Sequence, residues 1–241
     1  MTALLDADLL VGRDIVTGAR LSGDDVAVAV AGLGIGGGLV TSLRALLFDA
    51  PSGNDEARAV AAAHGWWAAA GVDLRDPLTA LAEVSRAASS DGTVRAVRLA
   101  LDRQAVPVTA PGVRAVAREA TAAGLVLLAE GDVRVVGPAL AGLDATVVFL
   151  DAHFYHLGDF VLLARDEPGF HASTRLLGDV DGWELVASDV GAERLVFGSR
   201  PGWFEAAAVV DRLAASDLTA SQRALVVEGN LRRLLGAGAT A

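Results

Sequence analysis

The sequence has no cysteine and no lysine. All 20 basic residues of this 241-residue chain are arginine. The lack of cysteine excludes disulfides, thiolate metal ligands and cysteine nucleophiles. Without lysine the chain can form neither a substrate Schiff base nor a bridging lysine carbamate, which removes two common enzyme chemistries. A metal site or a general base must therefore use carboxylates and the four histidines, His64, His153, His156 and His171.

Positive charge and long apolar runs are also scarce. The net charge of −10 argues against nucleic acid or an anionic membrane surface as a partner, because both need basic patches. The longest apolar stretch, "VAVAVAGLGIGGGLV", is shorter than the roughly 20 residues that span a bilayer. The N-terminal "MTALLDADLLVGRD" lacks the basic region of a signal peptide. We therefore expect a cytoplasmic protein.

Apolar strand-like runs alternate with amphipathic helical segments about every 30 residues, which is typical of repeated βα units and a parallel sheet. An apolar content of 53% can support a sizeable core. The predicted strands are 3–12, 36–43, 66–74, 94–101, 125–131, 145–153, 169–174 and 194–199. The predicted helices include 23–34, 54–64, 77–89, 111–124, 154–167 and 180–191, with a long loop over 44–54. Eight units predict an α/β (β/α)8 TIM barrel as a single domain over 1–241, and an open doubly wound sheet is the alternative.

Two motifs of common enzyme classes can be set aside. "GLGIGGG" contains the G-x-G-x-x-G pattern at Gly32, Gly34 and Gly37, but these glycines follow a predicted helix and precede a strand. Dinucleotide binding needs the reverse order, so a helix end and close packing explain the glycines better. No G-x-S-x-G occurs, and Ser199 in "GSRPG" has no obvious base beside it, which argues against a serine hydrolase.

In a barrel, the chemistry lies at the carboxyl ends of the strands. The polar residues near these ends are Asp8, Asn54, Arg98, Glu130, His153, His171 and Arg200. Such a mixed-charge mouth suits a small anionic or polar ligand, although mixed charge is also normal for solvated loops. His153 and His156 are spaced i, i+3 and could share a metal with Asp151 or Glu130. A strand-end histidine beside a surface histidine is the simpler interpretation.

The order of segments resembles the amidohydrolase-related family, the amidohydrolase 2 type of metal-dependent hydrolases and decarboxylases. The similar segments are "LLDADLLVG", "LLFDAPSGNDEARAVAAAHGWWAAAGVDLRDP", "TVRAVRLAL", "LVLLAEG", "VVFLDAH", "EPGFHAST", "GAERLVFGSRPGWF" and "LVVEGNLRRLLG". The likeness runs over nearly the whole chain, and the last two segments are fairly specific. It implies a distorted (β/α)8 barrel.

The departures from the family pattern fall on the chemistry. By the resemblance, the two family histidines of the first strand correspond to Asp8 and Leu10, and the strand-five histidine corresponds to Ala129. The strand-eight aspartate corresponds to Arg200, so only His153 is retained. Leucine and alanine offer no lone pair and arginine repels a cation, so these positions cannot hold a divalent metal in the family manner.

Two functional hypotheses follow. The first is a barrel without the family metal and without a cofactor, serving as a non-catalytic or regulatory subunit in a homo-oligomer or beside a metal-replete relative. The second is a metal-independent hydrolase, lactonase, decarboxylase or lyase acting on a small carboxylate. There His153 is the acid/base, Asp8 or Glu130 its carboxylate partner, and Arg98 or Arg200 the substrate anchor. Asn54 and His171 would help to bind the substrate. A relocated metal site using His153, His156 or His171 is a third possibility.

Overall fold

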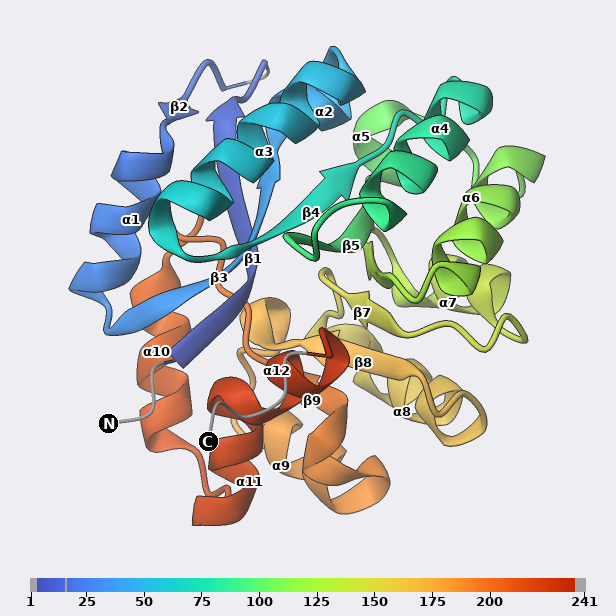
Figure 1. The fold of residues 1–241 in the computed structure, drawn as a ribbon. Helices are drawn as coiled ribbons and strands as arrows, with labels where there is room; N and C mark the ends of the chain where they lie inside the picture. Colours follow the sequence, from blue (N-terminus) through green and yellow to red (C-terminus); the bar gives the residue numbers. More distant parts are fainter. Residues whose placement is uncertain (1–3, 16, 237–241) are drawn as a thin grey trace.

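One curled, mostly parallel sheet forms the centre of the molecule in a computed structural model that describes residues 4–15 and 17–236 (Figure 1). The strand order is β2-β1-β3-β4-β5-β6-β7-β8-β9, so neighbours in the sheet follow chain order from β3 onward. Each step from β1 to β3 and on to β9 is parallel, and only the short β2 is antiparallel. The predicted α/β architecture with a parallel sheet is therefore confirmed.

The strands are short and almost wholly buried. They are β1 (Leu4–Arg13), β2 (Arg20–Leu21), β3 (Ile35–Ser42), β4 (Trp67–Gly71), β5 (Val94–Leu99), β6 (Val126–Ala129), β7 (Val147–Phe149), β8 (Phe170–Ser173) and β9 (Leu195–Val196). Both faces of the parallel strands are covered, which explains why they read as continuous apolar runs.

Most helices lie around the outside of the sheet, and α12 covers one end of its interior (Figure 1). They are α1 (Gly23–Gly32), α2 (Leu43–Leu47), α3 (Ala50–His64), α4 (Pro77–Ala88), α5 (Leu101–Gln104), α6 (Pro111–Ala122), α7 (Val133–Leu140), α8 (Leu157–Asp166), α9 (Gly182–Val186), α10 (Ala206–Ala215), α11 (Ala220–Ala224) and α12 (Asn230–Leu234). Local signals set their starts. Ser22 and Asp25 form a capping box at α1, and the side chain of Asp76 caps α4.

Several predicted bounds were wrong. The predicted loop over 44–54 is largely helical: α2 occupies its first part, and α3 begins at Ala50 with Pro51 in its first turn. The predicted eighth strand, 194–199, keeps only Leu195–Val196 in the ladder. Beyond it, Phe197 O accepts a hydrogen bond from Ala7 N at 2.9 Å, so the chain turns from β8 toward β1. The predicted helix over 180–191 becomes π-helical after Val186.

Side chains on the concave face of the sheet form three layers. An inner apolar cluster includes Leu5 of β1 and Ala96 of β5, and α12 closes it from below with Leu231. A second small apolar cluster near the carboxyl ends includes Leu10 and Ala100. Strand side chains alternate between the two faces of the sheet, so every second residue of a strand points to this interior. The middle layer, between the two apolar clusters, contains the charged groups of the candidate site.

The glycine-rich motif has a structural role. Gly34 ends α1 with a φ of 72°, a left-handed conformation that side chains disfavour. A side chain at Gly37 would meet the Trp66 indole, and one at Gly38 would collide with the Asp6 carbonyl. The prediction of a helix end and close packing is confirmed.

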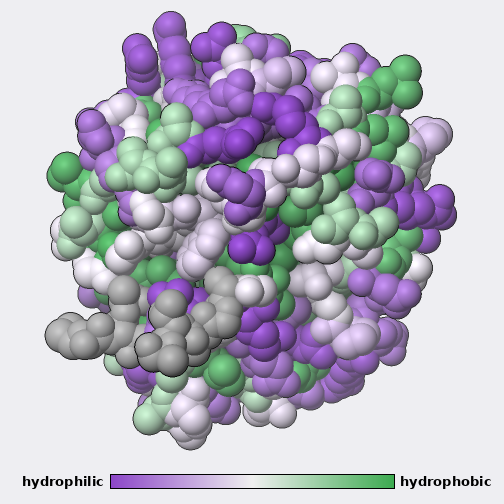
Figure 2. Space-filling view, in the orientation of Figure 1, coloured by the Kyte–Doolittle hydropathy of each residue, from purple (hydrophilic) through white to green (hydrophobic). Residues whose placement is uncertain are grey.

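Among the described residues, no helix is long and apolar enough to cross a membrane. On the face shown in Figure 2, apolar and polar side chains are intermixed in small groups.

Candidate functional site

Six charged side chains meet at the carboxyl ends of the strands. We call them the arginine–carboxylate cluster: Asp8 in β1, Arg98 in β5, Glu130 directly after β6, Asp151 after β7, Arg175 after β8 and Arg200 after β9. The sequence pattern predicted Asp8, Arg98, Glu130 and Arg200 at this end of the sheet, and the structure brings these four together.

Asp8 lies at the centre of the cluster with three guanidinium groups around it. Arg200 Nε is 2.8 Å from its Oδ2, Arg98 Nη2 is 2.9 Å from its Oδ1, and Arg175 Nε is 3.3 Å from its Oδ2. The Asp8 and Arg98 side chains are fully buried, and those of Arg175 and Arg200 are 3% and 4% exposed. The centre of the predicted mouth is therefore filled by ion pairs.

Glu130 is the second centre of the cluster. Arg98 donates to its Oε1 from Nε at 2.8 Å and from Nη2, and Arg200 Nη2 lies 3.4 Å from the same oxygen. Arg103, at the outer edge, donates from Nε to Oε2 at 2.8 Å. Burial would raise the pKa of Glu130, but the charges of Arg98, Arg200 and Arg103 outweigh it and lower the pKa to about 2.

The same balance holds for Asp8. Burial favours its protonated form, yet the charges of Arg200, Arg98 and Arg175 hold its pKa well below the usual range. Burial disfavours the charged form of Arg200, but the negative charges of Asp8 and Glu130 outweigh this effect and raise the pKa of Arg200 above its usual value. Both carboxylates and Arg200 are thus charged at neutral pH, and a substrate carboxylate would compete with Asp8 and Glu130 for Arg200.

Arg200 has a strained backbone. Its φ is 54°, in the left-handed region that favours glycine, and it immediately precedes Pro201. A non-glycine residue holds such a conformation only where surrounding contacts enforce it. The contacts here are the ion pairs to Asp8 and Glu130 and the ring of Phe204, 5.6 Å from the guanidinium carbon.

The remaining carboxylate, Asp151, reaches the surface. It pairs with Arg175 and accepts a hydrogen bond from Gly131 N at 3.0 Å, while its side chain is 25% exposed. Burial and the negative charge of Glu130 raise its pKa despite the charges of Arg200 and Arg175. Asp151 is therefore the cluster member best placed to exchange a proton with solvent.

His153 lies beside Asp151 in an open pocket of about 370 Å³. The pocket is lined by Asp102, Gly131, Asp132, Asp151, His153, Tyr155, His156 and Leu176. His153 Nδ1 accepts a hydrogen bond from Tyr155 N at 3.3 Å, which leaves Nε2 to carry the proton of the neutral ring. The His153 and Tyr155 rings stack with centroids 5.0 Å apart.

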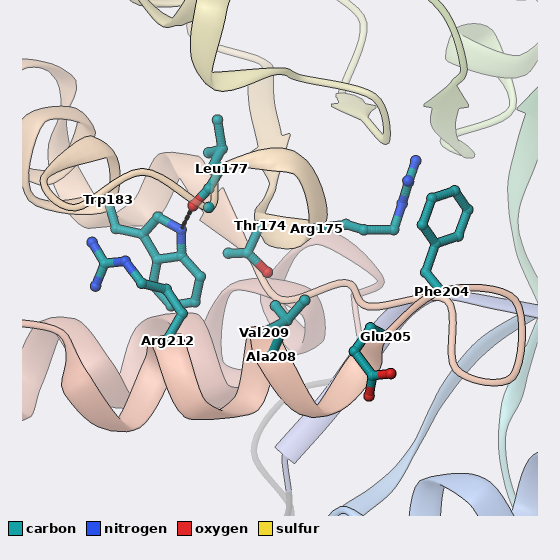
Figure 3. Close-up of a pocket in the computed structure, with 10 residues that line it drawn as sticks. Thr174, Arg175, Leu177, Trp183, Phe204, Glu205, Ala208, Val209 and Arg212 are labelled. Atoms are coloured by element: carbon teal, nitrogen blue, oxygen red, sulfur yellow. Dashed lines mark hydrogen bonds between the residues drawn. The ribbon is translucent and has the colours of Figure 1, made fainter.

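A second pocket, of about 270 Å³, lies between the segment after β8 and α10 (Figure 3). Its walls include Leu177, Trp183 and Val209, and Arg175 lies at one end beside Phe204. The Arg175 guanidinium carbon is 4.3 Å from the centre of the Phe204 ring. The pocket therefore has apolar walls, with two arginines, Arg175 and Arg212, and one acid, Glu205, in its lining.

The structure does not bring Asn54 or His171 to the cluster. Asn54 is buried on α3, where its amide pairs with both the N–H and the carbonyl of Gly71, at 2.8 and 2.9 Å. His171 is buried in β8, where its Nδ1 lies 2.8 Å from Gly169 O. Burial, together with the charges of Arg194 and Arg233, lowers its pKa to about 4. The partners of both residues are structural.

Three of the positions that the resemblance aligns with family metal ligands carry Leu10, Ala129 and Arg200. Leu10 and Ala129 are buried apolar residues, and Arg200 directs its guanidinium at Asp8. Within 4–15 and 17–236, no group of three or more His, Cys, Asp and Glu side chains could hold a metal ion. That finding also covers the relocated site considered for His153, His156 and His171.

Sequence reasoning missed two arginines of the site. Arg175 follows β8 by two residues, and Arg103 lies on α5, a short helix that the sequence did not predict. The available signal was charge: three acids, Asp8, Glu130 and Asp151, lie near strand ends with only two predicted cations, which leaves one acid without a counter-charge.

The fold is shared with several solved structures, although no family model and no curated protein matches the sequence. A 2,6-dihydroxybenzoate decarboxylase from Rhizobium is similar with a TM-score of 0.77 and 14% identity, over 98% of this chain and 99% of that one. A 5-carboxyvanillate decarboxylase from Sphingomonas paucimobilis is similar with a TM-score of 0.72 and 13% identity, over the same shares of the two chains. A TIM-barrel protein from Bordetella bronchiseptica is similar with a TM-score of 0.78 and 15% identity, over 97% of this chain and 98% of that one. At these identities the likeness establishes the fold.

Proposed function

We propose that this chain is a non-catalytic, metal-free barrel of the amidohydrolase-related type. One observation carries the proposal: three buried guanidinium groups surround Asp8, where the family resemblance would place a metal. Positive charge next to Asp8 repels a divalent cation, and the neighbouring Leu10 and Ala129 supply no ligand. The buried pairs leave no open coordination position at which a substrate could be polarised.

The proposal extends to architecture and assembly. We take the curled sheet as a closed (β/α)8 barrel forming one domain, which is supported by the Ala7 to Phe197 hydrogen bond and by the TIM-barrel neighbour. In this proposal the chain acts as a regulatory or partner subunit, in a homo-oligomer or beside a metal-replete relative. Light scattering of the purified protein, alone and co-expressed with such a relative, would test that assembly.

Metal analysis tests the proposal directly. We expect the purified protein to bind less than about 0.1 equivalent of zinc or manganese, because the matched positions offer only one intact family ligand, His153. We also expect a chelator to leave the melting temperature unchanged, since no folding energy would come from metal. Mass spectrometry of metals and thermal melts with and without chelator give both answers. Stoichiometric zinc that a chelator removes with loss of stability would overturn the proposal.

A second candidate function is supported by the pocket beside Asp151. Asp151 has a raised pKa and is partly exposed, and His153 lines the same pocket with its Nε2–H free to act. This arrangement supports metal-independent acid–base chemistry on a small carboxylate, the substrate class named for the two similar decarboxylases. In a decarboxylation the bond to the carboxylate would break, CO2 would leave, and His153 or protonated Asp151 would supply the proton to the carbon. Asp8 and Glu130, both ion-paired, would remain structural.

An activity assay with 2,6-dihydroxybenzoate and related carboxylates tests this second function. If product forms, we expect His153→Gln to lower kcat by about 100-fold or more, because a positioned acid or base contributes that much. His64→Gln, which changes a histidine on α3 that pairs with Asp24, is the matched control and should leave kcat unchanged. Turnover unaffected by His153→Gln would reject His153 as the acid/base.

A further inference from the structure

A third pocket contains three arginines and lies outside the arginine–carboxylate cluster. Its volume is about 380 Å³, and it is lined by Gly12, Arg13, Arg20, Arg44, Phe48 and Glu56. We call it the arginine pocket. It shares no residue with the cluster, so an inference about it does not depend on the proposed function.

The register of β1 and β2 places two of these arginines directly opposite each other. Arg13 pairs with Arg20 across the antiparallel ladder, and Gly12 pairs with Leu21. Like charges directly opposite destabilise a strand pair, and among the described strands β2 pairs with β1 alone. A third guanidinium reaches the same pocket from Arg44 at the start of α2.

Among the described residues, no acid forms a close ion pair with these three arginines, although the charge of Asp25 acts on Arg20 at longer range. Over the part of the chain that the structure describes, none of Arg13, Arg20 and Arg44 has a carboxylate oxygen within 4.0 Å. The one acid in the pocket, Glu56, instead accepts a hydrogen bond from Ser42 Oγ at 2.6 Å. In a chain with ten more acidic than basic residues, three arginines and one acid around one pocket form a local excess of positive charge.

We propose that the arginine pocket binds a multiply charged phosphate-type oxyanion. Guanidinium groups match phosphate oxygens with paired hydrogen bonds, and three of them can neutralise more than one negative charge. Phe48, 60% exposed at the same pocket, offers an apolar face to a flat organic group. The phosphate-bearing ligand is therefore either inorganic or an ester with a ring, such as a nucleotide.

Calorimetric titration at low salt with inorganic pyrophosphate and with ADP tests the proposal. We expect pyrophosphate to bind, and Arg13→Gln or Arg20→Gln to weaken its Kd by about 10-fold or more. Arg118→Gln, on the exposed face of α6, removes a comparable charge elsewhere and should change the Kd less than about 2-fold. An equal loss in Arg118→Gln, no loss in Arg13→Gln and Arg20→Gln, or no binding of either ligand would overturn the proposal.

Two further measurements sharpen the assignment. Tighter binding of ADP than of pyrophosphate, removed by Phe48→Ala, identifies an ester with a ring, and equal binding identifies the inorganic anion. Without anion, we expect Arg20→Gln to raise the melting temperature by about 1–3 °C, because it removes the opposed like charge. A lower melting temperature in Arg20→Gln would contradict the repulsion on which the proposal rests.

Discussion

Replacing Arg98 by methionine is expected to lower the free energy of unfolding by about 3–5 kcal/mol at pH 7. Arg98 is fully buried and forms ion pairs with both Asp8 and Glu130, so its loss leaves two desolvated carboxylates with fewer counter-charges. Methionine keeps most of the side-chain volume, so the loss reports charge rather than a cavity. Urea denaturation followed by circular dichroism measures it.

Controls separate the ion pairs from general damage. Arg118→Met, on the exposed face of α6, should change the stability by no more than about 0.5 kcal/mol. Adding Glu130→Gln to Arg98→Met should cost less than the sum of the two single changes, by about 1 kcal/mol or more, because the two groups interact. The deficit of Arg98→Met should also shrink toward pH 3, where the buried carboxylates left without Arg98 can protonate. A deficit below about 1 kcal/mol would mean that the cluster contributes little to folding.

The second large effect on the free energy of unfolding is expected at Asp6, where a substitution should raise the stability instead of lowering it. Asp6 is fully buried and forms no ion pair with a described residue, and burial raises its pKa to about 6 even though Ser199 Oγ donates to it at 2.5 Å. Because the folded pKa lies above the unfolded one, the folded state binds the extra proton between about pH 4 and pH 6. The contribution of Asp6 to stability is greatest below that window and is lost as the pH rises through 6. A shift from 3.8 to about 6 corresponds to a cost of about 3 kcal/mol at neutral pH.

We therefore expect Asp6→Asn to stabilise the protein at pH 7 by about 1–3 kcal/mol. The asparagine carbonyl can still accept from the N–H groups of Asp8 and Ser199, and its amide can donate to the serine hydroxyl. The gain should fade as the pH falls from 7 to 4, since the wild-type carboxyl becomes neutral there. Denaturation midpoints at several pH values measure this gain. Asp211→Asn, on the exposed face of α10, is the matched control. A variant that is less stable than the wild type at pH 7 would show that the charged form of Asp6 is the required one.

The sequence predicted the sheet well because buried parallel strands are continuous apolar runs, such as "LVLLAEG" and "VRAVRLAL". The prediction failed for very short elements and for elements whose ends depend on contacts with residues distant in the sequence. Helix α5 has only four residues, too few for a periodic pattern, and its Arg103 belongs to the site. Strand β9 stops at Val196, and the next residue, Phe197, accepts a hydrogen bond from Ala7 of β1. No local sequence pattern reveals this contact.

At the site, the sequence identified which residues meet but not what they do together. Asp8, Arg98, Glu130 and Arg200 lie at strand ends, so their position followed from the repeat. Their mutual pairing depends on how far the long arginine side chains reach across the interior, as Arg98 on β5 reaches Asp8 on β1. Arg98 and Arg200, expected to anchor a substrate, are instead held by the carboxylates of the protein itself.

The contact between Asp6 and Ser199 has a consequence for the order in which the chain folds. The two residues are 193 positions apart, so the sheet cannot join its ends until nearly the whole chain is available. Contacts this distant in sequence form late and slowly, because a large loop must close first. During synthesis on a ribosome, Asp6 and Asp8 would stay hydrated until the segment with Ser199 and Arg200 emerges. Nascent chains shorter than about 200 residues should therefore remain open and sensitive to protease along β1.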